Sequence, residues 1–231
     1  MLHILDDIPI IITVEDAIKQ LMIEEAEDVA LITGLFNAAK AVAKPKAIYR
    51  EVFVEDIRGD LVRINDTEFT SNVLAVNMKG VHRVFAYVCT CGVEVDEWSK
   101  SVDDYMTMLW VDMIKQMFLT EANVCLRDHV KNVFGFEKLS SVNPGSGNVE
   151  NWPISQQAPL FEMIGDIKEG IGVTLTDSFL MVPLKSTSGL LFPSETDFSN
   201  CALCSRKHCP NRRAEFDGDL YKKAFKEGMS L

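Results

Sequence analysis

Apolar and polar residues alternate at helical spacing near the start of the chain. Thr13, followed by Glu15 and Asp16, is typical of a helix N-terminus, because the hydroxyl caps free backbone N–H groups and acids favour the first turn. Apolar residues continue that pattern as far as position 22. We predict a second helix over about 26–43, which Pro45 ends.

The longest helical pattern lies in the middle of the chain. The segment 101–104 has the residues of an N-cap, and nothing breaks the pattern before Gly135, so we expect about 30 residues and about 45 Å of helix. A methionine-rich stripe can form a cofactor face, but core packing is its commoner role. We therefore predict a central core helix whose apolar stripe is Met106, Leu109, Trp110, Met113, Ile114, Met117 and Phe118.

Strand patterns surround this helix. The segments 47–54 and 81–88 are rich in β-branched and aromatic residues, and the second ends at Cys89-Thr-Cys91-Gly92. After the long helix we predict a strand over 138–142, a short helix that ends at Gly165, and a hairpin over 178–192.

Helices and strands do not alternate as they do in βαβ units. This order favours an α+β fold with a mostly antiparallel sheet and flanking helices, including the long central one. We assign residues 1–192 to one domain. Residues 193–231 form a short cysteine-containing tail, which we expect to pack on the same domain.

The charge balance of the 231 residues is acidic. Thirty-four acids and 23 bases give a net charge of −11, which argues against nucleic-acid binding as the main task. Eight of the acids and one base, Lys19, lie within residues 1–30. That stretch is either a solvated helical face or a docking surface for a basic partner.

The first residues bear no basic segment followed by a long apolar one, so we expect no secretory signal. The apolar run Ile8–Ile12 is too short to span a bilayer. Free thiols in a chain of this kind point to the reducing cytoplasm, and we expect a cytoplasmic protein without a membrane partner.

Three of the six cysteines cluster near the C-terminus: Cys201, Cys204 and Cys209. This compact spacing suits a tetrahedral zinc site or an iron–sulfur cluster. The fourth ligand is His208, a distant cysteine such as Cys89 or Cys91, or an exogenous group. Four bases nearby favour thiolates. The alternative is three reduced thiols that bind nothing, whereas Cys89, Cys91 and Cys125 need only a packing role.

The segment 143–148, Asn-Pro-Gly-Ser-Gly-Asn, can present backbone N–H groups to a ligand. It is not a dinucleotide fingerprint, because Glu150 stands where a third glycine is needed and no P-loop lysine follows. On local sequence alone it is a plain turn.

Several motifs follow one another in a fixed order from residue 141 to residue 192. They are Ser-Val-Asn-Pro-Gly-Ser-Gly at 141–147, Trp-Pro at 152–153 with Gln157 and Leu160-Phe161, Gly-Val-Thr-Leu-Thr-Asp-Ser at 172–178, and Met-Val-Pro-Leu-Lys-Ser-Thr-Ser-Gly at 181–189. Together they resemble the activation domain of cobalamin-dependent methionine synthase, and more closely its stand-alone relatives.

The resemblance implies a curved, mostly antiparallel sheet with flanking helices. It also implies binding of S-adenosylmethionine, which remethylates a corrinoid whose cobalt has been oxidised to cob(II)alamin, once an electron is supplied. The family's proline–glycine loop contacts this ligand and corresponds here to Asn143, Pro144 and Gly145. We extend the expected ligand-binding set along the same motifs to Ser146, Gly147, Lys185 and Ser186.

Two positions depart from the family pattern. Ser141 replaces an arginine that would pair with the methionine carboxylate, and Ser146 replaces a tyrosine that would supply an aromatic contact. The corrinoid-ligand motif D-x-H-x-x-G is absent from the sequence. We therefore expect any corrinoid to be held by a partner, either a corrinoid protein or a methyltransferase.

The resemblance and the cysteine cluster together predict an accessory protein. It would support reductive activation or remethylation of a corrinoid, with S-adenosylmethionine as small-molecule ligand and an iron–sulfur or zinc site. A methyl-donor domain without redox work of its own is a variant of this role. The alternative is a non-catalytic binding module with a structural zinc and a degenerate ligand pocket. Whether the chain is itself an enzyme is left open.

Overall fold

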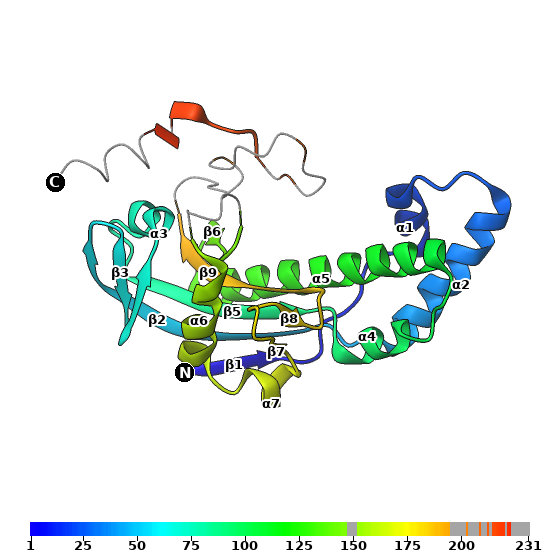
Figure 1. Ribbon diagram of the computed structural model, residues 1–231, viewed down its shortest axis with the longest axis horizontal. Coiled ribbons are helices and arrows are strands. Elements are labelled where there is room, and N and C mark those ends of the chain that lie inside the picture. The colour runs from blue at the N-terminus through cyan, green and yellow to red at the C-terminus, as the bar shows by residue number, and fades with distance from the viewer. Residues whose placement is uncertain are drawn as a thin grey trace.

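A computed structural model describes residues 1–146 and 152–194, together with positions 202, 208, 212, 214–219 and 221–222 of the tail. Its main sheet has seven strands in the order β4-β3-β2-β5-β9-β6, with β1 also paired to β2, and these pairings are antiparallel (Figure 1). The strands are β1 (Leu2–Leu5), β2 (Lys46–Arg58), β3 (Leu61–Ile64), β4 (Thr67–Thr70), β5 (Arg83–Thr90), β6 (Leu139–Val142) and β9 (Ser186–Pro193). The predicted α+β class with a mostly antiparallel sheet is confirmed.

Helices cover both faces of this sheet. The long helix α5 (Tyr105–Phe134) runs along the sheet, and Figure 1 shows three helices gathered around its N-terminal end: α1 (Val14–Leu21), α2 (Ala26–Val42) and α4 (Val93–Ser99). Between residues 72 and 171 the structure also has the helices α3 (Asn72–Asn77), α6 (Gln157–Ile164) and α7 (Ile167–Ile171), and the 3-10 turn η1 (Ile154–Gln156). A two-stranded sheet joins β7 (Thr174–Leu175) to β8 (Met181–Val182).

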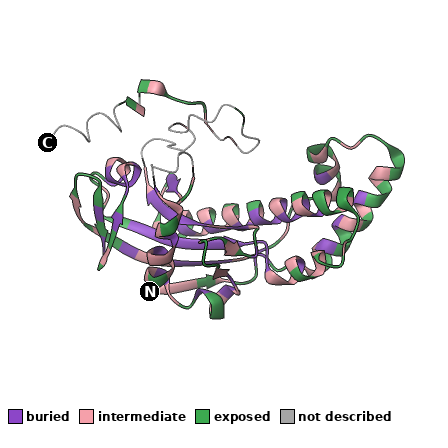
Figure 2. Cartoon of the chain, viewed as in Figure 1, coloured by how far each residue is buried: buried purple, intermediate pink, exposed green. Residues whose placement is uncertain are grey.

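Two hydrophobic cores lie on opposite faces of the sheet. Along β5, Val84, Ala86 and Val88 belong to the core beneath α6 and α7, and the alternate residues Phe85 and Tyr87 belong to the core beneath α5. Because successive side chains of a strand point to opposite faces, a strand covered on both sides is apolar throughout. This explains why nearly every residue of β5 is buried, as Figure 2 shows for the central strands.

The predicted helix ends are confirmed at α1 and α5. The Thr13 side chain accepts a hydrogen bond from the Asp16 N–H, and the Asp16 carboxylate accepts one from the Thr13 N–H, which completes a capping box. At α5 the carboxylate of Asp104 accepts from the Thr107 N–H, and Gly135 ends the helix in the left-handed conformation. The helix has 30 residues, as expected.

The prediction that the whole stripe of α5 lies in the core is wrong for its first turns. Ile114, Met117 and Phe118 are buried, but Met106 is 51% exposed and Met113 is 46% exposed. The cause is visible in Figure 1, where the N-terminal part of α5 extends past the ends of the strands. Helical spacing identifies residues on one side of a helix, but it cannot tell how far the covering sheet reaches.

The predicted hairpin over 178–192 is also wrong. β8 pairs with β7, whereas β9 lies between β5 and β6 in the main sheet.

The expected strand at 138–142 and the short helix ending at Gly165 are present as β6 and α6. Within the part of the chain that is described, no helix is both long and apolar enough to cross a membrane.

Candidate functional site

The loop that follows β6 forms one wall of a cleft of about 350 Å³, within the range typical of small-molecule sites. The opposite wall comes from α6, from the segment around β8 and from the start of β9. The residues that line the cleft are Asn143, Pro144, Gly145, Ser146, Ile154, Gln157, Leu180, Met181, Leu184, Thr187 and Ser188.

Asn143 fixes this loop to the sheet. Its side-chain amide donates hydrogen bonds to the Tyr87 hydroxyl at 2.8 Å and to the Ser188 carbonyl at 2.7 Å, and so connects the loop to both β5 and β9. Gly189 makes this approach possible, because a Cβ there would lie 2.4 Å from the Val142 carbonyl oxygen and 2.6 Å from the Asn143 amide nitrogen. The loop therefore has a defined position against the sheet.

Gly145 is required by the shape of the turn. Its φ of +71° lies in the left-handed region, and its N–H donates to the Trp152 carbonyl at 2.8 Å. Trp152 is 1% exposed, and its indole N–H donates to Gln156, which in turn bonds both backbone groups of Thr70. The Trp-Pro motif thus anchors the far side of the loop to the sheet.

A set of buried, hydrogen-bonded polar groups forms the floor of the cleft. Gln157 is 3% exposed; its amide nitrogen donates to the Phe179 carbonyl, and its amide oxygen accepts from the Ser188 hydroxyl at 2.7 Å. These bonds connect three parts of the fold: helix α6, the segment that precedes β8, and strand β9. The sequence motifs contain Gln157 and Ser188, but nothing local indicates that they meet, because they are 31 positions apart.

The predicted ligand-binding residues divide into three groups. Asn143, Pro144, Gly145 and Ser146 line the cleft, whereas Gly147 lies outside the described residues. Lys185 and Ser186 are not among the lining residues. The Lys185 ammonium pairs with Asp112 of α5 at 2.7 Å, and the buried Ser186 hydroxyl donates to the Pro183 carbonyl at 2.7 Å. Ligand contact by any of these residues stays a prediction.

The described lining of the cleft is neutral, with hydroxyl, amide and apolar groups but no charged side chain. Ser141, where the family pattern has an arginine, is 4% exposed within β6. This arrangement suits a ligand held by hydrogen bonds and apolar contacts. A bidentate ion pair to a carboxylate has no partner among the described lining residues.

The predicted metal ligands Cys201, Cys204 and Cys209 lie outside the described residues, and His208 is exposed. Among the residues that are described, no three His, Cys, Asp or Glu side chains are grouped as metal ligands would be. Cys89 and Cys91 are fully buried. Burial raises the pKa of both thiols, that of Cys91 to about 12, so both are held as neutral thiols.

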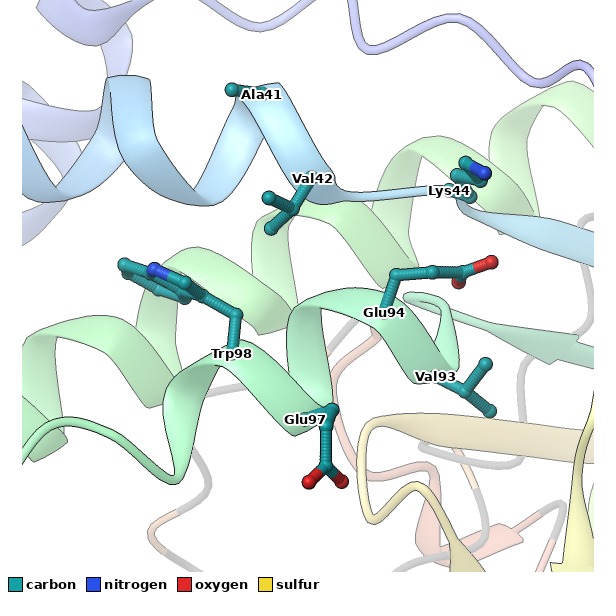
Figure 3. Close-up of a pocket in the computed structure, with 7 residues that line it drawn as sticks. All are labelled: Ala41, Val42, Lys44, Val93, Glu94, Glu97 and Trp98. Atoms are coloured by element: carbon teal, nitrogen blue, oxygen red, sulfur yellow. The ribbon is translucent and has the colours of Figure 1, made fainter.

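A second hollow, of about 720 Å³, lies between the end of α2 and α4 (Figure 3). In Figure 3 the indole of Trp98 faces Val42, and the carboxylate of Glu94 extends toward Lys44. One carboxylate oxygen of Glu94 also pairs with Lys46 at 3.4 Å. This hollow is mainly apolar, and none of the residues predicted to bind the ligand lines it.

Among solved structures, the fold is similar to that described as "Crystal Structure of the MetH Reactivation Domain bound to AdoHcy". The TM-score is 0.59 at 14% sequence identity, and the match covers 86% of this chain and 80% of that chain. This likeness shows a shared fold. No protein-family model matches the chain. No curated protein matches it either.

Proposed function

We propose that this chain is an accessory protein that binds S-adenosylmethionine in the cleft beside Asn143 and supports remethylation of a corrinoid held by a separate protein. Two features that agree with each other support the proposal. The loop that the sequence resemblance associates with the ligand, residues 143–146, lines a cleft of ligand size. The chain also shares its fold with a reactivation domain whose structure contains AdoHcy, the product left when S-adenosylmethionine gives up its methyl group.

The chain's own residues would position the ligand rather than react with it. The Asn143 amide holds the loop against β5 and β9, and Gln157 and Ser188 hold the floor, so the cleft is shaped before a ligand arrives. When bound, S-adenosylmethionine supplies the methyl group that reduced cobalt accepts. Because the described lining has no cation to pair with the ligand's carboxylate, we expect weaker binding than an arginine at position 141 would give.

The tail would supply the second component of this role. Cys201, Cys204 and Cys209 are proposed to hold an iron–sulfur cluster or zinc, together with a fourth ligand. An iron–sulfur cluster would deliver the one electron that converts cob(II)alamin to the state that accepts a methyl group. Zinc would only hold the tail in place. Iron and acid-labile sulfide analysis of anaerobically purified protein separates the two.

Calorimetric titration with S-adenosylmethionine and S-adenosylhomocysteine tests the cleft. We expect heat from both ligands and a several-fold loss of affinity in Thr187→Val, which removes a lining hydroxyl without changing its volume. Thr67→Val, on β4 and outside the cleft lining, is the matched control and should bind as the parent does. No heat from either ligand at millimolar concentration would exclude the proposed site.

A separate experiment, which follows the visible spectrum of the cobalt, tests the proposed role in corrinoid remethylation. A corrinoid protein loaded with cob(II)alamin, mixed anaerobically with this chain, S-adenosylmethionine and a reductant, should give the visible spectrum of methylcobalamin. An unchanged cobalt spectrum, with ligand binding intact, would restrict the chain to binding alone.

One observation favours the alternative function, a non-catalytic binding module with a structural zinc and a degenerate ligand pocket. Ser141 is buried in β6 and the described lining is uncharged, so the pocket has departed from the family pattern at its carboxylate-binding position. One equivalent of zinc without iron, combined with no heat from S-adenosylmethionine, would establish this alternative.

A further inference from the structure

The N-terminal half of α5 has an exposed apolar face that the proposed function does not use. Met106, Met108, Leu109 and Met113 are each between 44% and 51% exposed, and Tyr105 is 71% exposed. We call these five residues the apolar face of α5. Figure 2 shows intermediate and exposed residues along the outward side of this helix. Single exposed apolar residues are ordinary on protein surfaces, but five within nine positions of one helix are typical of an interaction site.

The buried side of the same stretch is fully occupied. Val111 and Ile114 are buried, and Lys115 forms an ion pair with Asp96 of α4 at 2.6 Å. Tyr105, Leu109 and Met113 are spaced four residues apart and so lie on one side of the helix, away from those contacts. Met106 lies beside Met113 on this side, and Met108 lies at its other edge, next to Asp112, whose carboxylate pairs with Lys185 at 2.7 Å.

Acidic residues are frequent in the elements that pack against α5 and in the turn before it. Helices α1 and α2 both contact α5, and together with the turn between them they contain six acids against two bases, Lys19 and Lys40. The acids are Glu15, Asp16, Glu24, Glu25, Glu27 and Asp28. Asp103 and Asp104 are exposed immediately before α5. The charge at this end of the molecule is thus strongly negative, whereas the side chains of the face itself are uncharged.

We propose that the apolar face of α5 and the acids around it bind a basic amphipathic helix of a partner protein. The apolar side of such a helix would cover the three methionines, whose flexible side chains adapt to different partner shapes. Its lysines and arginines would lie against α1, α2 and the start of α5, where the opposite charges increase the association rate and fix the orientation.

The same charge pattern argues against two other occupants. A second copy would bring an equally acidic end against this one, in a chain whose net charge is −11, and the two would repel each other. An anionic lipid surface would be repelled for the same reason. The proposal does not depend on ligand binding in the cleft, so the proposed function and this surface can fail separately.

The test uses the full chain and a fluorescently labelled helical peptide made only of leucine and lysine, with leucines at i, i+3, i+4 and i+7. A scrambled peptide of identical composition controls for charge alone. We expect the amphipathic peptide to bind more tightly than the scrambled one in anisotropy titrations. Added salt should weaken the binding.

Three variants locate the binding. Met106→Gln/Leu109→Gln/Met113→Gln removes apolar surface with little change in helix propensity and should lower the affinity about tenfold or more. Val124→Gln/Val133→Gln, on the same helix at 50% and 55% exposure, is the matched control and should bind as the parent does. Glu24→Gln/Glu25→Gln/Glu27→Gln leaves the apolar face intact and should lower the affinity several-fold at low salt. Far-ultraviolet circular dichroism checks that each variant folds.

Equal binding of the two peptides would overturn the proposal, as would an unchanged affinity in the triple glutamine variant of the apolar face. Sedimentation that shows a dimer, lost in that variant, would assign the face to a second copy instead. Binding to phosphatidylcholine vesicles, lost in the same variant, would assign it to lipid. Should the apolar-face variant fail to fold, the charge variant and the scrambled peptide still decide the outcome.

Discussion

The side-chain amide of Asn143 lies 2.8 Å from the hydroxyl oxygen of Tyr87, and the bond crosses from the candidate loop to the strand at the centre of the sheet. The same amide nitrogen donates to the Ser188 carbonyl. One side chain therefore connects three segments that are distant in sequence: 45 positions separate Asn143 from Ser188, and 56 separate it from Tyr87.

Removal of this amide should loosen the loop. We expect Asn143→Ala to lower the free energy of unfolding by about 1–3 kcal/mol, because two hydrogen bonds are lost at a partly buried site. Tyr87→Phe removes only one of the two acceptors and should cost less. Urea denaturation measures both changes. Equal stability of Asn143→Ala and the parent would show that these bonds contribute nothing to the fold.

The tight approach between β9 and the candidate loop predicts a contrast between two glycines. Gly189→Ala would place a Cβ against the Val142 carbonyl and the Asn143 amide, so we expect a loss of about 1–3 kcal/mol from overpacking. Gly34→Ala, in the interior of α2 with open space around the new methyl group, should instead stabilise the protein by about 0.5–1 kcal/mol. Thermal unfolding of the two variants should shift in opposite directions.

The buried ion pair between Lys115 and Asp96 should respond unequally to loss of each partner. Lys115 is 7% exposed, and its ammonium also contacts the Ser99 hydroxyl at 3.0 Å. Asp96→Ala leaves that ammonium buried without its counter-ion, and we expect a loss of about 3–5 kcal/mol. Lys115→Met keeps the packing of the stem and leaves a carboxylate in the first turn of α4, where the helix dipole favours it, so its cost should be smaller. Denaturant titration measures the free energy of unfolding of both variants. Equal losses in the two would contradict the expected order.

Because the Asp104 carboxylate caps α5, the free energy of unfolding should depend on pH in the acid range. Hydrogen bonds from the Thr107 N–H and hydroxyl lower the pKa of Asp104 below its ordinary value of 3.8. Because the folded pKa is the lower one, this contribution is complete above the unfolded pKa and is lost as the pH falls through the folded value. Asp104→Asn keeps a capping side chain without the titration. Between about pH 5 and about pH 2 the variant should therefore lose less thermal stability than the parent.

Thiol chemistry should divide five of the six cysteines into two classes. Burial raises the pKa of the Cys89 and Cys91 thiols, so iodoacetamide near neutral pH should leave both unmodified in the folded protein. Cys201, Cys204 and Cys209, if they hold a metal as proposed, should react only after a chelator removes it. Mass spectrometry of the labelled peptides measures how far each cysteine has been modified. Rapid labelling of Cys89 would mean that β5 opens readily, and labelling of the three tail thiols without chelator would argue against a bound metal.

Local chemistry in the sequence accounts for the parts of the fold that were predicted correctly. The Thr13 cap, the Asp104 cap and the Gly135 stop act within one helical turn, so their residues are adjacent in the chain. Several short elements were not predicted, because a few residues give only a weak periodic signal. β1 and β3 have four residues each, and α7 has five. The mistaken hairpin shows the same limit, since the partners of β9 lie in β5 and β6, far earlier in the chain.

The candidate site was predictable in part. The resemblance in the motifs identified the loop at Asn143, Pro144 and Gly145, and the structure places it beside a cleft. The contact of Gln157 with Ser188 was not predictable, because two polar residues in separate motifs give no signal that the fold brings them together. The exposed methionines of α5 were mistaken for core because periodicity describes a helix but says nothing of its neighbours.

The position of β9 between β5 and β6 has a consequence for synthesis of the chain. β5 is complete at Thr90, but the strand that covers its open edge begins only at Ser186, about a hundred residues later. At ribosomal rates of about 5–20 residues per second, that edge waits roughly 5–20 seconds for its partner. During this interval β5 presents unpaired backbone groups in a nearly continuous apolar strand, which is the arrangement most prone to pairing with another chain. The nascent protein is therefore most in need of protection by chaperones after β5 has emerged and before β9 has been made.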